Sequence, residues 1–185
     1  SISQVSALLK VYESACNKSG NHPELFITHI TGILDDYFAD IVKKEKLGIP
    51  HDILAQAGTI IAKKEYSYLR NAGYSGRMLG GGARGMQHFT NFVGGDMHIT
   101  INWSTAIELN DSQEEPVLTI DDRADAAVIE ELTEKLPNFE RAYIDGAMNI
   151  EEFEDFGPTM LFRTQFMNGF SRLIDAIAAE KRRTK

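Results

Sequence analysis

Short apolar segments with the composition of β-strands alternate along this chain with longer segments whose apolar residues recur at helical spacing. This alternation limits the fold more than any other feature. Three segments are predicted as strands, at residues 25–30, 77–79 and 98–103, and a helical pattern follows each of them. Strands that alternate with helices form parallel sheets through right-handed crossovers. The sequence therefore predicts an α/β fold with about three parallel strands.

Apolar periodicity predicts helices over residues 2–15, 33–42, 53–72, 86–93, 104–109, 124–136, 150–156 and 159–181, the last being the longest. Gly32 is expected to end the first strand and Gly73 to follow the helix at 53–72. The polar segment 110–122 is expected to be a surface loop. A length of 185 residues fits a single domain, and residues 110–158 are interpreted as an insertion or a lid within it.

The charge and the cysteine content exclude several classes of protein. The chain has 19 Lys and Arg against 27 Asp and Glu, a net charge of −8, which argues against nonspecific binding to nucleic acid. No apolar run approaches the ~20 residues that span a bilayer, so no membrane association is expected. The one cysteine, Cys16, cannot form an internal disulfide, and it is expected to be a buried thiol in a cytoplasmic protein.

The most informative motif is a glycine-rich segment directly after the second predicted strand. Gly80, Gly81 and Gly82 leave the backbone free to point its N–H groups into one concavity. Arg84 lies within the same loop, and its planar guanidinium can donate two parallel hydrogen bonds to a dianion. These residues predict a phosphate-binding loop at the carboxyl end of a parallel strand. The alternative is a tight turn whose arginine pairs with a local carboxylate.

The same loop fits the dinucleotide pattern GxGxxG only weakly. Gly80, Gly82 and Gly85 match its glycines, but the helix that follows is short. The next predicted strand also ends in Asn102 and Trp103 rather than in an acidic residue. No dinucleotide or other cofactor is therefore predicted.

Polar residues at the ends of two other predicted strands complete the candidate site. Thr28 and His29 lie at the end of the first strand, where a hydroxyl can contact a substrate or be satisfied by the backbone. Asn102 lies at the matching end of the last strand, and Trp103 beside it is expected to pack. The histidines lack the spacing of metal ligands, so no metal site is predicted.

No lysine lies on a predicted strand. A lysine forms a Schiff base readily when its amine is desolvated, and no lysine here is in a segment predicted to provide that environment. The lysines all fall on the surface or at the ends of predicted helices. No catalytic residue is therefore assigned within the chain.

The order of these segments resembles the C-terminal half of a transaldolase. Residues 27–37 (ITHITGILDDY) are similar to the family's strand that ends in Ser or Thr and Gly before a helix starting Ile-Leu-Asp. Residues 72–74 (AGY) and 78–84 (MLGGGAR) are similar to its Gly-Tyr and to its glycine-rich loop with an arginine. Residues 93–101 (VGGDMHITI) and the Gly-Phe at 169–170 match two later segments. The resemblance is carried by the order and spacing of these segments.

The resemblance implies a (β/α)₈ barrel, of which this chain would be the C-terminal portion, and a transferase of carbohydrate metabolism in the pentose phosphate pathway. In that family a lysine Schiff base transfers a dihydroxyacetone unit from a ketose phosphate to an aldose phosphate. Arg84 matches the phosphate-binding arginine and Thr28 a substrate-contacting Ser or Thr. Ile33, Gly82 and His29 occupy positions where the family has a second arginine, a serine and a proline, respectively. These differences leave open that the substrate is a different phosphosugar, or that the enzyme is an aldolase rather than a transferase.

The resemblance also implies that the Schiff-base lysine precedes Ser1. On that hypothesis the chain binds the phosphate of a sugar-phosphate substrate but does not turn it over by itself. It would then associate with the N-terminal half or form a homo-oligomer, which would cover the open edges of its sheet. The alternative is a stand-alone, non-catalytic α/β module that binds phosphate or nucleotides.

Overall fold

The computed structural model describes residues 1–74, 76–113 and 115–183. Within these residues, three strands form one parallel sheet in the order β1 (Phe26–Ile30), β2 (Arg77–Gly81) and β3 (Met97–Ile99). Thr28 lies opposite Leu79, and Leu79 lies opposite His98. The predicted α/β fold with three parallel strands is confirmed.

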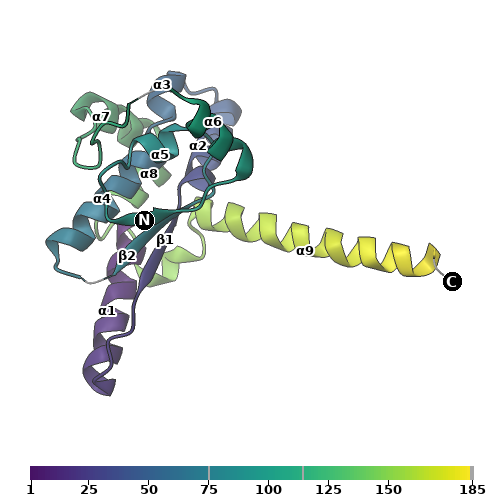
Figure 1. The fold of residues 1–185 in the computed structure, drawn as a ribbon, viewed down its shortest axis with the longest axis horizontal. Coiled ribbons are helices and arrows are strands. Elements are labelled where there is room, and N and C mark those ends of the chain that lie inside the picture. Colours follow the sequence, from purple (N-terminus) through teal and green to yellow (C-terminus); the bar gives the residue numbers. More distant parts are fainter. Residues whose placement is uncertain (75, 114, 184–185) are drawn as a thin grey trace.

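Helices connect and flank these strands (Figure 1). They are α1 (Ile2–Ser19), α2 (Thr31–Glu45), α3 (His51–Leu54), α4 (Ala57–Asn71), α5 (Gln87–Thr90), α6 (Trp103–Asp111), α7 (Ala126–Lys135), α8 (Pro137–Tyr143), the 3₁₀ helix η1 (Ile150–Phe153) and α9 (Gly157–Arg183).

Most of the longer predicted helices are confirmed, with two differences in the first half of the chain. Gly32 lies in the first turn of α2, so the helix begins one residue earlier than the glycine that was expected to precede it. The helix expected over 53–72 is divided into α3 and α4. Gly73 does follow α4, at a φ of 70°, and the Tyr74 N–H donates to the Leu69 carbonyl across it.

The predicted strand at 98–103 is wrong over residues 100–103. β3 ends at Ile99, and Asn102 is the N-cap of α6, where its side chain accepts a hydrogen bond from the Thr105 N–H. Trp103 begins that helix and is 80% exposed, so the expectation that it packs is also wrong. Helix-capping by Asn102 outweighed the β-branched composition of the segment.

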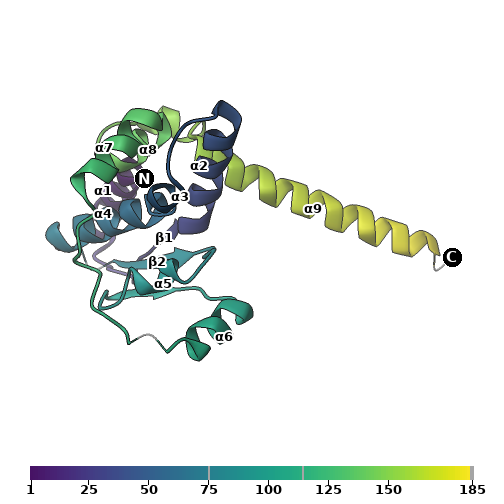
Figure 2. The ribbon, with the colours of Figure 1, turned by 90° about the horizontal axis from the view of Figure 1, so that it is seen from above.

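The sheet has a helix-covered face and an exposed face. Ile27 and Met78 are buried on the first face, in a cluster that includes Leu9 of α1 and Tyr66 of α4. Figure 2 shows these helices on one side of β1 and β2. Residues of β1 alternate between buried and exposed, and its exposed side includes Thr28.

A second core cluster joins α2, α4, α7 and α8 beside the sheet. Phe38, Leu132 and Phe139 are fully buried in it. The helices α7 and α8 thus contribute to the core, although they fall within the segment 110–158. The interpretation of that segment as an insertion or a lid stays a prediction.

The last helix, α9, projects from the rest of the molecule (Figures 1 and 2). It begins against α2, where Gly157 lies so close to the Tyr37 ring that a Cβ would overlap it. From Arg163 to Ile177 its side chains are exposed. In the described part of the chain, no helix is long and apolar enough to cross a membrane.

Candidate functional site

The glycine-rich loop lies at the carboxyl end of β2, directly on the first turn of α2. Gly82 has a φ of 62°, which favours glycine because a Cβ is strained in this region. A Cβ on Gly32 would overlap the Gly82 carbonyl oxygen. The glycines at these two positions therefore allow the loop and the helix to approach each other closely.

The Arg84 guanidinium is fixed in orientation by the Asp36 carboxylate. Nε and Nη2 of Arg84 donate to Asp36 at 3.1 and 2.8 Å, and Nη1 donates to the Gly82 carbonyl at 2.7 Å. The two charged side chains are 42% and 38% exposed. A guanidinium has five N–H donors. Two of them therefore remain for another acceptor after these three contacts.

A buried histidine holds the backbone of the same loop. The Arg84 N–H donates to Nδ1 of His88 at 3.0 Å, so His88 carries its proton on Nε2 when it is neutral. Nε2 donates in turn to Asp35 at 2.6 Å, and the other Asp35 oxygen accepts the Gly58 N–H at 2.9 Å. His88 is 1% exposed. This network ties the loop to α2 and to the start of α4.

The structure brings some of the predicted site residues together and separates others. Gly82 and Arg84 are in contact, and Gly80 and Gly81 are the last two residues of β2. Thr28 lies on the exposed face of β1, in its middle rather than at its end. Asn102 is occupied by the capping of α6, so its side chain is committed to Thr105 and Ser104.

His29 pairs with Gly80 of β2, but its side chain lies on the helix-covered face of the sheet, opposite to that of Thr28. Its Nδ1 is 2.9 Å from Glu65 of α4, and the second Glu65 oxygen is 3.0 Å from the Ser1 amino nitrogen. Burial raises the pKa of Glu65, but in a chain that begins at Ser1 the amino group and His29 together outweigh this and lower it to about 2. Nε2 of His29 has no hydrogen-bond partner among the described residues.

The sequence did not identify Asp35, Asp36, Glu65 or His88 as members of these networks. Each of these side chains meets its partner only through the tertiary fold, since Asp35 and His88 are separated by 53 positions. Asp35 and Asp36 are adjacent in the sequence, but Asp35 hydrogen-bonds to His88 and Gly58, whereas Asp36 holds Arg84.

Two lysines are less exposed than the sequence predicted. Lys63 donates to the Thr119 carbonyl at 2.5 Å, and burial lowers its pKa although Asp122 opposes the shift. Lys64 lies 3.8 Å from the centre of the Tyr143 ring, and burial lowers its pKa as well. Both lie on α4, and the described strands contain no lysine.

The described part of the chain holds no group of three or more His, Cys, Asp or Glu side chains arranged to bind a metal ion. No protein-family model, curated protein or solved structure matched the chain.

Proposed function

We propose that this chain is the phosphate-binding part of a transaldolase-like enzyme, in which a lysine Schiff base transfers a dihydroxyacetone unit between sugar phosphates. The observation that carries the proposal is the position of Arg84. It lies in a glycine-rich loop at the carboxyl end of a parallel strand and keeps two N–H donors unused. In α/β folds, ligands bind at this end of the strands.

The backbone of the loop adds further donors. No described residue accepts a hydrogen bond from the amides of Gly82, Ala83 or Gly85. The His88 and Asp35 network holds this backbone through the Arg84 N–H. A phosphate bound there would meet N–H groups that are already in place, which reduces the ordering cost of binding.

The topology of the sheet supports the proposal that the chain is part of a (β/α)₈ barrel. Its strands are neighbours in chain order, and α1 and α4 cover one face. Parallel sheets are found almost only where both faces are covered. A barrel would enclose the exposed face that carries Phe26 and Thr28, and it would pair the open edges of β1 and β3.

In this proposal the glycine-rich loop and Arg84 bind the phosphate group, and this binding orients the ketose for reaction at a lysine on another strand. The lysine amine adds to the ketose carbonyl and water leaves, which forms the Schiff base. Orientation of the reacting groups supplies several kcal/mol toward the barrier. Because the strands described here contain no lysine, the proposal assigns that residue to a strand outside residues 1–185.

Calorimetric titration of the chain with fructose 6-phosphate and with fructose tests the proposed phosphate site. The phosphate ester is expected to bind and the free sugar to show no measurable binding. Arg84→Ala is expected to weaken binding of the ester by about 1.5–3 kcal/mol, the range for charge-assisted hydrogen bonds. Arg77→Ala is the matched control, because Arg77 is an exposed arginine at the opposite end of β2. Equal losses in the two variants, or equal binding of both sugars, would contradict the proposal.

Borohydride reduction distinguishes the enzyme from the stand-alone phosphate- or nucleotide-binding module. The gene product that contains residues 1–185 is incubated with fructose 6-phosphate and sodium borohydride. Hydride then reduces the C=N bond of the Schiff base, and the mass increases by one reduced sugar phosphate. Phosphate binding without this covalent label would favour the non-catalytic module.

A further inference from the structure

One side of α9 is apolar and uncovered along its projecting part. The side chains on it are between 46% and 66% exposed: Phe166, Met167, Phe170, Leu173, Ile174 and Ile177. Helices in water are stabilised mainly by packing of such a side against another element. The exposed side of α9 is therefore a surface for association.

We propose that α9 pairs in antiparallel orientation with α9 of a second copy of this chain. Phe166, Phe170, Leu173 and Ile177 follow one another at intervals of four, three and four residues. This is the heptad spacing of a seam between two helices. Met167 and Ile174 lie beside the seam and widen it.

The spacing of the seam is the same in both directions along the helix. In an antiparallel pair, Phe166 of one copy lies opposite Ile177 of the other, and Phe170 lies opposite Leu173. Each contact then occurs twice, related by a two-fold axis between Ser171 and Arg172. Such a contact uses the same surface on both copies, so assembly stops at the dimer.

The charges at the two ends of the seam favour the antiparallel orientation. The next seam positions are Arg163, three residues before Phe166, and Glu180, three residues after Ile177. Glu180 also pairs with Arg183 of its own helix at 3.2 Å. The antiparallel pair places Arg163 of each copy opposite Glu180 of the other. A parallel pair would instead place like charges opposite each other.

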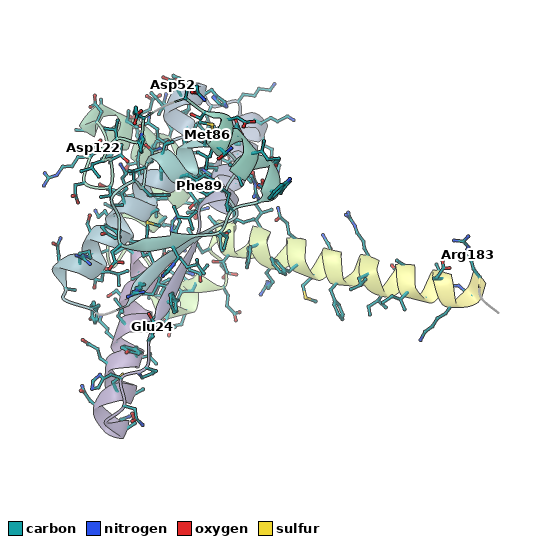
Figure 3. All side chains as sticks on the ribbon, in the orientation of Figure 1. Glu24, Asp52, Met86, Phe89, Asp122 and Arg183 are labelled. Atoms are coloured by element: carbon teal, nitrogen blue, oxygen red, sulfur yellow. The ribbon has the colours of Figure 1, made fainter. Side chains whose placement is uncertain are left out.

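The length and the charge of the helix fit the same register. Arg183 of one copy lies opposite Met160 of the other, near the point where α9 leaves the body of the protein. The basic end of α9, at residues 181–183, is then directed toward the start of the partner copy's α9, which follows the exposed acidic residues Glu154 and Asp155 in the chain. Figure 3 shows Arg183 at the far end of the helix, well beyond the body.

Sedimentation equilibrium of the 185-residue chain tests the pairing. A dimer is expected, and Phe170→Asp is expected to give a monomer because it places carboxylates next to the two-fold axis. Circular dichroism and thermal melting check that the body remains folded, since Phe170 lies outside both core clusters. A monomeric wild-type chain, or a dimer that survives Phe170→Asp, overturns the proposal.

A charge reversal tests the orientation and the register. Arg163→Glu and Glu180→Arg are each expected to weaken the dimer at least about tenfold, and the double variant is expected to restore it. Arg172→Glu is the matched control, because it makes the same change on the side of α9 that faces away from the seam. If the double variant stays as weak as the single ones, or if Arg172→Glu weakens the dimer equally, the proposed register is wrong.

Discussion

Two regions of this α/β unit each pair a carboxylate with a basic side chain, but in different ways. On the helix-covered face, His29 and Glu65 form a pair whose side chains are each 2% exposed. At the carboxyl end of β2, Asp36 and Arg84 form a pair that is roughly 40% exposed. The first pair is closed to solvent, whereas the second retains N–H donors that a ligand can use. The comparison indicates that the buried pair serves to stabilise the fold, whereas the exposed pair is available as part of a candidate binding site.

The energetic consequences of breaking these pairs also differ. Removing one partner of a buried ion pair costs about 3–5 kcal/mol, because the remaining charge is left uncompensated. An exposed pair contributes only about 0–1 kcal/mol, because water replaces the lost partner. Substitutions in the two regions therefore test the comparison directly.

The largest expected effect is that of Glu65→Gln. It removes the charge that faces His29 and, in the 185-residue chain, the Ser1 amino group, and it is expected to lower the free energy of unfolding of that chain by about 3–5 kcal/mol. Urea unfolding measures this change. Glu131→Gln, which breaks the exposed pair with Lys135, is the control and is expected to cost about 0.2–0.5 kcal/mol. Similar losses in the two variants would remove the distinction between the buried pair and the exposed ones.

The pH dependence of stability sharpens the same contrast. In the folded 185-residue chain the pKa of Glu65 is about 2, whereas its ordinary value is 4.5. Its contribution to stability is thus complete above pH 4.5 and is lost as the pH falls toward 2. The difference in unfolding free energy between the wild type and Glu65→Gln is expected to shrink over this range. A difference that stays constant from neutral pH down to pH 2 would contradict the assigned pairing.

An intermediate effect is expected for His88→Leu. This change removes the acceptor for the Arg84 N–H and the donor to Asp35, which leaves a half-buried carboxylate with fewer partners. The expected loss of stability is about 1–3 kcal/mol. Binding of fructose 6-phosphate is expected to weaken as well, because the loop backbone loses its anchor. His22→Leu, at an exposed position, is the control and should change neither measurement.

The smallest effect is expected for Asp36→Asn. The pair with Arg84 is exposed, so stability is expected to change by no more than about 1 kcal/mol. Thermal unfolding in parallel with Glu65→Gln provides the comparison. A loss as large as that of Glu65→Gln would mean that the ion pair at the loop is as important to the fold as the buried one.

Local sequence patterns predicted much of the fold. The glycine at position 73 and the apolar spacing of α1, α2 and α4 indicate helices from near neighbours in the chain. The prediction was wrong where two local preferences compete, as at residues 100–103. There Asn102 caps α6, although the β-branched composition favours a strand.

The candidate site was predicted only in part, for a related reason. The glycines at 80–82 and Arg84 are adjacent in sequence, so their loop is visible as a motif. Asp36 lies 48 positions from Arg84, and no local pattern indicates that the two meet. The same holds for Asp35 and His88, whose contact depends on how α2 packs beside β2.

The sequence by itself determined the alternation of strands and helices, the loop with its arginine and the heptad spacing of α9, because these depend on residues within a few positions of one another. Tertiary structure alone decided which carboxylate holds Arg84, that Glu65 is buried against His29, and that the apolar side of α9 is uncovered. These properties arise from contacts between distant segments and from exclusion of water, which exist only once the chain has packed.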